Sequence, residues 1–164
     1  MPSAGHFLTW ELLIALRARG VGLAHLTHAA GISSTGSAEV DRRFPLAERY
    51  EIGERTAEAV RATRTKGGRV VAVGTTVVRA LEASFAEHGQ VRASAGLARL
   101  VRGPGFRPKV VDAVLSGMHE KGTSHFALLE AFAHADLLHA ALEAAESEGY
   151  LQHEFGDATL VLRS

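Results

Sequence analysis

The chain has 164 residues, of which 46% are hydrophobic and 22% charged, so it can bury an ordinary globular core and disorder is excluded as its main state. Its 18 basic and 18 acidic side chains cancel, which excludes a whole-chain charge that attracts nucleic acid or an anionic membrane, so any RNA contact must be local. Cysteine is absent, and no apolar run is long enough for a membrane span or a signal peptide. We expect a single cytoplasmic domain over residues 1–164.

The first part of the chain is predicted to hold a helix, a strand and a loop. Leucines at helical spacing follow Thr9, a residue type that caps helices, and the helix is expected to end at Gly20. The apolar run 21–27 predicts a short strand. Residues 31–37 are rich in Gly, Ser and Thr, which predicts a loop of the kind that often carries function.

The middle of the chain alternates helix and strand patterns. Residues 54–66 carry an apolar stripe and stop at Gly67, which predicts an amphipathic helix. The β-branched run 70–73 predicts a buried parallel strand, and it passes directly into a helix over 76–88 that Gly89 closes. This order of elements predicts a right-handed βαβ arrangement.

The last part of the chain contains further elements separated by turn residues. They are expected to be a strand over 97–101, a turn over 103–105, an apolar run over 109–115, a helix from Thr123 or Ser124 to about Phe132, a helix capped by Asp136 that runs to Glu148, and a strand over 159–162. The sequence therefore predicts the α/β class, with a mixed or mostly parallel sheet flanked by helices.

Four motifs in a fixed order resemble one enzyme family. Residues 70–82, VVAVGTTVVRALE, are similar almost letter for letter to the most recognisable motif of the S-adenosylmethionine:tRNA ribosyltransferase-isomerases of queuosine biosynthesis. The other three are Pro2-Ser3-Ala4-Gly5, Pro104-Gly105-Phe106 with Lys109-Val110-Val111-Asp112, and Glu148-Gly149-Tyr150 with Gly156-Asp157-Ala158. The match covers the C-terminal half of the family, so the resemblance implies that the family's N-terminal β-barrel domain is lacking.

The resemblance implies a reaction and its partners. The family transfers and isomerises the ribosyl group of S-adenosylmethionine onto 7-aminomethyl-7-deazaguanine in tRNA, so S-adenosylmethionine is a substrate and no metal is required. Such chemistry needs a base beside the sulfonium, an acid for the departing adenine and groups that orient the sugar. The implied partners are tRNA and either the missing half of the family or a second copy, because an incomplete sheet exposes apolar surface.

The longest motif supplies candidate substrate-binding residues. Gly74, Thr75 and Thr76 join a strand end to a helix N-terminus, where free backbone N–H groups bind carboxylates or phosphates. Arg79, one turn later, could hold the methionine carboxylate or a phosphate. Glu82 is a further candidate. Two purely structural interpretations stay open, namely a capped turn at Thr75 and an ion pair of Glu82 with Arg79.

His119 is the candidate acid or base, because it matches a family histidine and imidazole titrates near neutral pH. Its surroundings differ from the family, which has Leu-Pro and then Ser-Thr where this chain reaches Thr123-Ser124 through Glu120-Lys121-Gly122. Asp112 and Asp157 are the other catalytic candidates, although such carboxylates also cap turns. Pro104, Gly105, Phe106 and Ser124 complete the predicted substrate-binding set, and the backbone's need for glycine is a second interpretation of Gly105.

Two family histidines are displaced by one position. Phe7 and Ala29 stand where the family has histidine, and His6 and His28 each come one residue early. Two interpretations stay open, namely loop adjustments and a divergent subgroup whose substrate or reaction has changed. The nine histidines do not suggest metal, because the close pairs lack the i, i+4 spacing of helical zinc sites and no cysteine joins them.

A basic cluster is the candidate tRNA contact, although such clusters are also common on solvated surfaces. It consists of Arg99, Arg102, Arg107 and Lys109. Two alternatives to the enzyme stay open: a noncatalytic S-adenosylmethionine-binding or nucleotide-binding or assembly module derived from the family, and a related transferase with another acceptor.

Overall fold

A computed structural model describes residues 3–31, 37, 39, 47–99, 105–119, 122–151 and 156–163 of the chain. In chain order the elements are η1 (Ser3–Gly5), α1 (Trp10–Ala18), β1 (Thr27–His28), β2 (Glu48–Ile52), α3 (Glu54–Thr65), β3 (Val71–Val73), α4 (Thr75–His88), β4 (Ser94–Ala98), β5 (Ala113–Gly117), α5 (Ser124–Leu129), α6 (Ala135–Ser147) and β6 (Ala158–Leu162). Helices and strands alternate, so the expected α/β class is confirmed.

The first sheet is antiparallel, with the order β1-β2-β4. Its central strand β2 alternates buried and exposed residues, and Glu48, Tyr50 and Ile52 point inward. Tyr50 lies opposite His28 on β1 and opposite Gly96 on β4. A Cβ atom at position 96 would lie 2.8 Å from the Tyr50 hydroxyl, so this close approach requires glycine.

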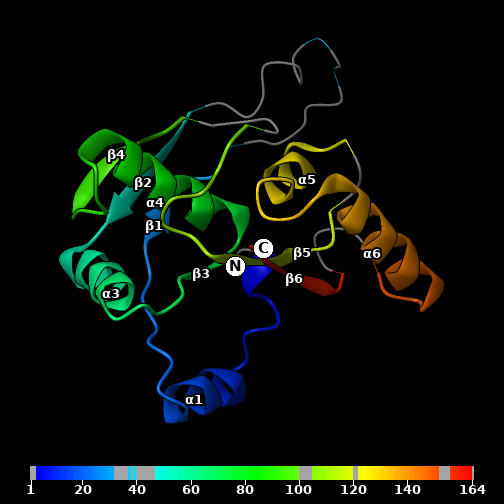
Figure 1. The fold of residues 1–164 in the computed structure, drawn as a ribbon, viewed down its shortest axis with the longest axis horizontal. Helices are drawn as coiled ribbons and strands as arrows, with labels where there is room; N and C mark the ends of the chain where they lie inside the picture. Colours follow the sequence, from blue (N-terminus) through cyan, green and yellow to red (C-terminus); the bar gives the residue numbers. More distant parts are fainter. Residues whose placement is uncertain are drawn as a thin grey trace.

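The second sheet is mixed, with the order β3-β5-β6. Strands β3 and β5 run parallel and β6 runs antiparallel to β5, so Ala72, Val114 and Val161 form one row across the sheet. All three are buried. Figure 1 shows α5 and α6 on one side of this sheet and α4 between it and the first sheet. Helix α4 contacts strands of both sheets, so it joins the two halves of the core.

Most predicted elements are confirmed. Helix α3, strand β3 and helix α4 lie where the sequence places them, and Gly89 ends α4 in the left-handed conformation. Thr123 caps α5, its hydroxyl accepting a hydrogen bond from the Phe126 N–H. The last strand is confirmed as β6.

Five expectations are wrong in detail. The strand over 21–27 is absent apart from Thr27, and its Val21 and Leu23 are exposed, because no neighbouring strand pairs with this segment among the described residues. The helix capped by Asp136 is capped by His134 instead, whose imidazole accepts from the Asp136 N–H.

The other three corrections concern the sheets. The expected single sheet is two sheets, since the unforeseen strand β2 pairs with β1 and β4. The strand expected over 97–101 is Ser94–Ala98, and residues 100 and 101 lie outside the described part. Val71 of β3 is 51% exposed, so β3 is buried on one side rather than on both.

Candidate functional site

The candidate site lies where the parallel strands β3 and β5 end. Gly74 follows β3, and its N–H donates to the Leu115 carbonyl of β5 at 2.8 Å. Its φ of +92° favours glycine, and a Cβ atom there would lie 3.3 Å from the Cβ of Ala4. The motif around Ala4 therefore meets the motif around Gly74 at the carboxyl edge of the sheet, where α/β proteins commonly bind ligands.

Two histidines stack at this edge. The rings of His119, which follows β5, and His125, in the first turn of α5, lie 4.6 Å apart with planes inclined by 19°. The Thr75 hydroxyl lies 3.0 Å from His125 Nδ1, and the Ser116 hydroxyl lies 2.8 Å from His119 Nε2. Thr75 and Ser116 are buried, so each ring is held by a fixed hydroxyl.

The environment of His119 favours its neutral form. Burial, and then the charge of His125, lower the pKa of His119 from 6.5 to about 4. The imidazole is therefore uncharged near neutral pH. A neutral imidazole can accept a proton, so the arrangement suits a general base better than a general acid.

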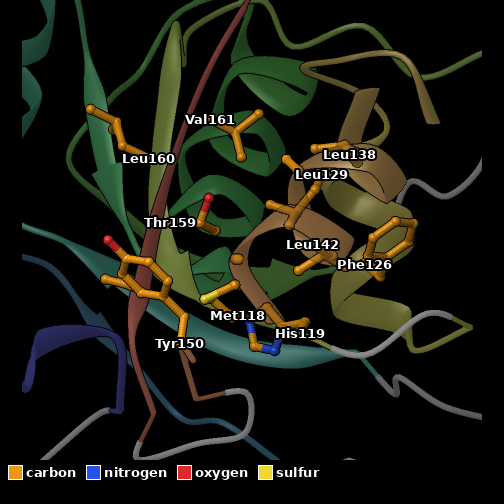
Figure 2. A pocket seen from close by; sticks show the side chains of 13 residues that line it. Met118, His119, Phe126, Leu129, Leu138, Leu142, Tyr150, Thr159, Leu160 and Val161 are labelled. Carbon is orange, nitrogen blue, oxygen red and sulfur yellow. The ribbon is translucent and has the colours of Figure 1, made fainter. Parts of the chain in front are cut away.

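An apolar cavity of about 290 Å³ opens beside His119. Figure 2 shows the side chains of Met118, Phe126, Leu129 and Leu142 around it, together with Thr159 and Val161 of β6. The cavity lies between α5, α6 and β6. It offers a mainly apolar space next to the imidazole that an apolar or aromatic part of a small molecule could enter.

Asp157 lies at the same edge as His119. Its backbone carbonyl accepts from the Met118 N–H at 3.2 Å, immediately before His119. Its carboxylate accepts from the Leu151 N–H at 2.8 Å. This contact is that of a loop anchor, and a catalytic role of Asp157 stays a prediction.

Arg79 lies one turn after Thr75 in an ionic cluster. Its Nη1 pairs with Oε2 of Glu48, and its Nη2 donates to the Ala98 carbonyl at 3.3 Å. His28 Nε2 lies 3.5 Å from the same carboxylate oxygen. The arginine and glutamate side chains are 8% and 9% exposed. Glu48 thus neutralises the guanidinium predicted to hold an anionic substrate group.

His28 shows what a one-residue displacement does. Its imidazole is buried beside Glu48, whereas Ala29 is exposed. Successive side chains of a strand point to opposite faces. A histidine at position 29 would therefore face away from the cluster, whereas His28 faces into it. Burial, opposed by Glu48 and assisted by Arg79, lowers the pKa of His28. His6, the other displaced histidine, is exposed.

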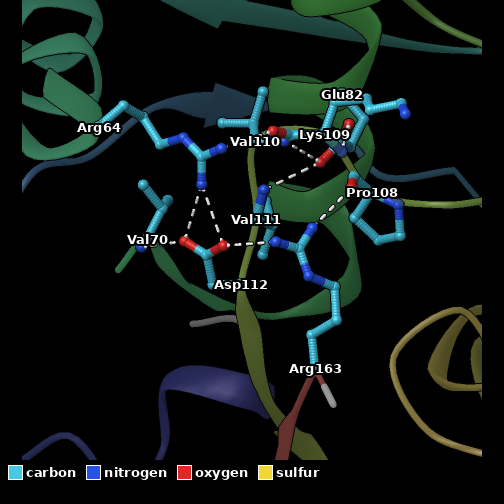
Figure 3. Close-up of polar contacts among 9 residues, drawn as sticks. All are labelled: Arg64, Val70, Glu82, Pro108, Lys109, Val110, Val111, Asp112 and Arg163. Carbon is cyan, nitrogen blue, oxygen red and sulfur yellow. Dashed lines mark hydrogen bonds and ion pairs between the residues drawn. The ribbon is translucent and has the colours of Figure 1, made fainter. Parts of the chain in front are cut away.

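Glu82 does not form an ion pair with Arg79 but anchors the chain before β5. Its carboxylate accepts from the backbone N–H groups of Lys109, Val110 and Val111 at 2.9, 2.9 and 3.0 Å (Figure 3). A buried carboxylate with three backbone donors is well satisfied. Its predicted role in substrate binding remains untested.

Asp112 lies at the amino edge of the sheet, opposite the end that holds His119. Its carboxylate contacts Arg64 and Arg163 at 3.0 and 2.9 Å and accepts from the Val70 N–H at 2.9 Å (Figure 3). These contacts tie β3, α3 and β6 together. The structure therefore does not bring Asp112 together with His119, and its catalytic role stays a prediction.

The remaining candidates divide between two places. Thr76 is half-buried in the first turn of α4, and Ser124 is half-buried next to His125, so both lie near the stacked histidines. Gly105 is exposed, and Phe106 lines a small cavity beside Arg79 and Glu82. Pro104 lies outside the described residues.

Sequence reasoning missed three residues of these clusters. His125 belongs to one of the close histidine pairs, which the sequence shows only to lack zinc-site spacing, although its place two residues after the cap Thr123 puts it in the first turn of α5. Ser116 belongs to an apolar run, where a lone serine is a weak signal. Glu48 belongs to strand β2, whose alternation is masked because this buried position carries a charge.

Neither a membrane-spanning helix nor a cluster of metal ligands occurs in the described part of the chain. No helix among the described residues is both long and apolar enough to cross a membrane. Within that same part of the chain, no three His, Asp or Glu side chains gather as metal ligands would.

Comparison with known proteins identifies relatives over nearly the whole chain. The chain is 39% identical over 166 residues to the S-adenosylmethionine:tRNA ribosyltransferase-isomerase of Acidiphilium cryptum, which covers 99% of this chain and 48% of the relative. The protein of the same name from Deinococcus radiodurans is 40% identical over 164 residues, covering 99% and 45%. The chain thus spans about half the length of the curated relatives it matches.

A solved structure agrees with these relatives. The crystal structure of S-adenosylmethionine tRNA ribosyltransferase from Thermotoga maritima matches with a TM-score of 0.81 and 33% identity, over 98% of this chain and 52% of that chain. The family described as "Queuosine biosynthesis protein" matches residues 1–161. The resemblance inferred from the four motifs is confirmed, and the chain belongs to the queuosine biosynthesis protein family.

Proposed function

We propose that this chain provides the proton-transfer part of a tRNA ribosyltransferase-isomerase, which transfers and isomerises the ribosyl group of S-adenosylmethionine onto 7-aminomethyl-7-deazaguanine in tRNA. The observation that carries the proposal is His119, a neutral imidazole at the carboxyl edge of the parallel strands, beside an apolar cavity. The names of the relatives give S-adenosylmethionine, tRNA, ribosyl transfer and isomerisation, and the acceptor base is the one that the family resemblance implies.

In this proposal the chain's residues divide the work. His119 accepts the proton beside the sulfonium, and Ser116 orients the ring through Nε2. The first turn of α4, with Thr75 and Thr76, offers backbone N–H groups to a carboxylate or phosphate of the substrate. Asp157 and Ser124 shape the same edge. S-adenosylmethionine acts as the ribosyl donor, and no metal is required.

Calorimetry with S-adenosylmethionine tests this function. The titration is made on the chain alone and on the chain mixed with the part of the Acidiphilium cryptum relative that lies outside the match. We expect binding to the mixture, and weaker binding after Thr75→Val. Heat that stays at the level of dilution with millimolar S-adenosylmethionine in both samples would rule out the proposed function. Glu58→Gln, an exposed change on α3, is the matched control.

The proposed macromolecular partner is tRNA, and we expect the chain to bind it in the cytoplasm. Arg99, Arg107 and Lys109 are exposed around the segment that carries Phe106, and Arg102 lies outside the described residues. Cations gathered on one surface contact phosphates through a salt-dependent interaction. We expect the anticodon stem-loop to bind more tightly at low salt. The double substitution Arg99→Ala with Arg107→Ala should weaken this binding.

The second proposed partner covers the outer face of the second sheet. Val71, Leu160 and Leu162 are 51%, 54% and 52% exposed, and the strand register places Val71 and Leu162 on either side of Ala113. Parallel strands are normally covered on both faces. We propose that polypeptide equivalent to the unmatched half of the relatives covers this face, and that a second copy of the chain does so when that half is lacking.

One observation favours the alternative of a noncatalytic module derived from the family. The displaced His28 is buried against Glu48 and cannot face a ligand on the exposed side of β1. A module that binds S-adenosylmethionine without chemistry would release no adenine. Mass spectrometry of the tRNA product and of free adenine, in the mixture described above, separates the two functions.

A further inference from the structure

The stacked pair of histidines carries an inference beyond the proposed function, on which it rests. We propose that His125 is a positioning residue, which holds the His119 ring in one orientation for proton transfer. Only His119 would meet the substrate. His125 would act through it, from the first turn of α5.

The geometry explains why a second ring is needed. The Ser116 hydroxyl fixes one atom of His119, Nε2, at 2.8 Å. One hydrogen bond leaves an imidazole free to tilt about that contact. The His125 ring, 4.6 Å away and inclined by 19°, lies across its face and restricts that tilt. Together the two contacts define both the position and the plane of the His119 ring.

His125 is itself fixed from the other side of the site. Its Nδ1 lies 3.0 Å from the hydroxyl of Thr75, the first residue of α4, and Thr75 is buried. A continuous line of contacts therefore runs from α4 through His125 and His119 to Ser116 on β5. The residue proposed to meet the substrate's anionic group is thus joined to the proposed base.

The charges around the pair support the same role. Two imidazoles this close disfavour a proton on both, because like charges repel in a partly buried place. His125 is the second cause, after burial, of the lowered pKa of His119. Two other titratable groups lie at this edge: Tyr150 lines the cavity beside His119, and the Asp157 carboxylate accepts from Leu151. Glu120 and Lys121 lie outside the described residues.

A packing role alone would not require the Thr75 contact. A comparable stack joins Phe126 and His139, with ring centres 5.2 Å apart and planes inclined by 19°. There one partner is a phenyl ring. If His125 served packing only, phenylalanine would replace it without changing the state of His119, and this difference makes the two roles separable.

Nuclear magnetic resonance of the chain labelled with ¹⁵N-histidine tests the inference through the ring-nitrogen shifts, which report tautomer and protonation. In the unmodified chain we expect one neutral tautomer of His119 near neutral pH. His125→Phe keeps a flat ring but removes Nδ1, and we expect the His119 nitrogen shifts to move and its pKa to rise towards the ordinary value. The matched control is His139→Phe, which should leave His119 unchanged.

A second pair of variants keeps the test valid if His125→Phe fails to fold. Thr75→Val removes the hydroxyl at nearly constant shape, and should change the nitrogen shifts of both His125 and His119. Thr75→Ser restores the hydroxyl and should restore the shifts. If the His119 shifts match those of the unmodified chain in both His125→Phe and Thr75→Val, the inference is overturned. If His125→Phe is unfolded, unchanged His119 shifts in Thr75→Val overturn it.

Failure of the inference and failure of the proposed function can be told apart. If S-adenosylmethionine does not bind but the His119 shifts respond to both changes, the proposed reaction fails and the positioning of His119 by His125 is supported. If S-adenosylmethionine binds and the shifts do not respond, the positioning role alone is overturned.

Discussion

Oε1 of Glu82 accepts a hydrogen bond of 2.9 Å from the backbone N–H of Val110. The same carboxylate also accepts from Lys109 and Val111, so one side chain of α4 satisfies three consecutive backbone donors. Residues 109–112, which lead into β5, form no helix or strand, and this carboxylate fixes them against α4. The contact therefore sets where β5 begins, and with it the place of Ser116 and His119.

Glu82→Gln is expected to lower the free energy of unfolding by about 2–3 kcal/mol, because bonds to a charged acceptor are strong and the glutamine amide presents a donor to a backbone donor. Urea unfolding followed by circular dichroism measures the change. Glu58→Gln, at an exposed position of the neighbouring helix α3, should change stability by less than about 0.5 kcal/mol. Equal losses in both variants would mean that Glu82 is not an anchor.

The Arg79–Glu48 pair is expected to show strong coupling. Because both side chains are buried, removing either charge leaves the other uncompensated, and Arg79→Met or Glu48→Gln alone should cost about 3–5 kcal/mol. The double variant should cost clearly less than the sum of the two. A double-mutant cycle by urea unfolding measures the coupling free energy.

The exposed pair Arg61–Glu54 is the matched comparison for that cycle. Its side chains are 37% and 61% exposed, and its coupling should stay below about 1 kcal/mol. Additive losses at Arg79 and Glu48 would show that the buried pair contributes no more than this surface pair.

His119 is expected to make the stability of the chain fall in acid. Its pKa is lowered from 6.5 to about 4 in the folded protein, so between these values the unfolded chain binds the proton more readily. The contribution of the neutral ring is complete above pH 6.5 and is lost as the pH falls towards 4, by at most about 1.4 kcal/mol per pH unit.

Urea unfolding of the unmodified chain and of His119→Asn, at several pH values from 4.5 to 7.5 (about one pH unit apart is enough to resolve the slope), isolates this contribution. The difference between the two stabilities should shrink as the solution is acidified. A constant difference would contradict the lowered pKa of His119. Because the pKa of His28 is also lowered, the variant must retain His28.

The outer face of the second sheet is expected to drive association. Leu160→Glu with Leu162→Glu places two charges on this exposed face, and should convert an associated chain to monomer without a large loss of stability. Sedimentation velocity measures the change. Leu137→Glu, at an exposed leucine of α6, is the control. A monomer before any substitution would leave no self-association for this face to explain.

Much of the fold follows from patterns that are local in the sequence. Helix α3 and helix α4 have apolar stripes and glycine stops, and the β-branched run before Gly74 forms β3. Strand β2 was not foreseen because a charged residue, Glu48, occupies a buried position that the sequence pattern assigns to solvent. Arg79, 31 residues away, pairs with this carboxylate, and the Gly31 N–H donates to it at 2.7 Å, and periodicity does not report such partners.

The candidate site was foreseen in part. The motif from Val70 to Glu82 located Thr75, and the family histidine located His119, but no pattern indicated that His125 would stack on it. That contact depends on the angle at which α5 leaves the sheet. The prediction of a strand over 21–27 was wrong for a similar reason. An apolar run forms a strand only when a neighbouring strand or helix covers it, and Val21 and Leu23 are exposed.

Helix α4 carries its polar contacts at Thr75, Arg79 and Glu82, which lie on one side of the helix and reach α5, β2 and the start of β5. The spacing of these three residues along α4 therefore fixes how the helix sits against its neighbours. One alanine inserted after Arg79 would turn Glu82 by about 100° away from its backbone donors while Thr75 and Arg79 keep theirs. Length changes inside α4 should thus be far less tolerated than in the exposed turn at Gly67, because an insertion breaks the contacts of Glu82 even though that side chain is kept.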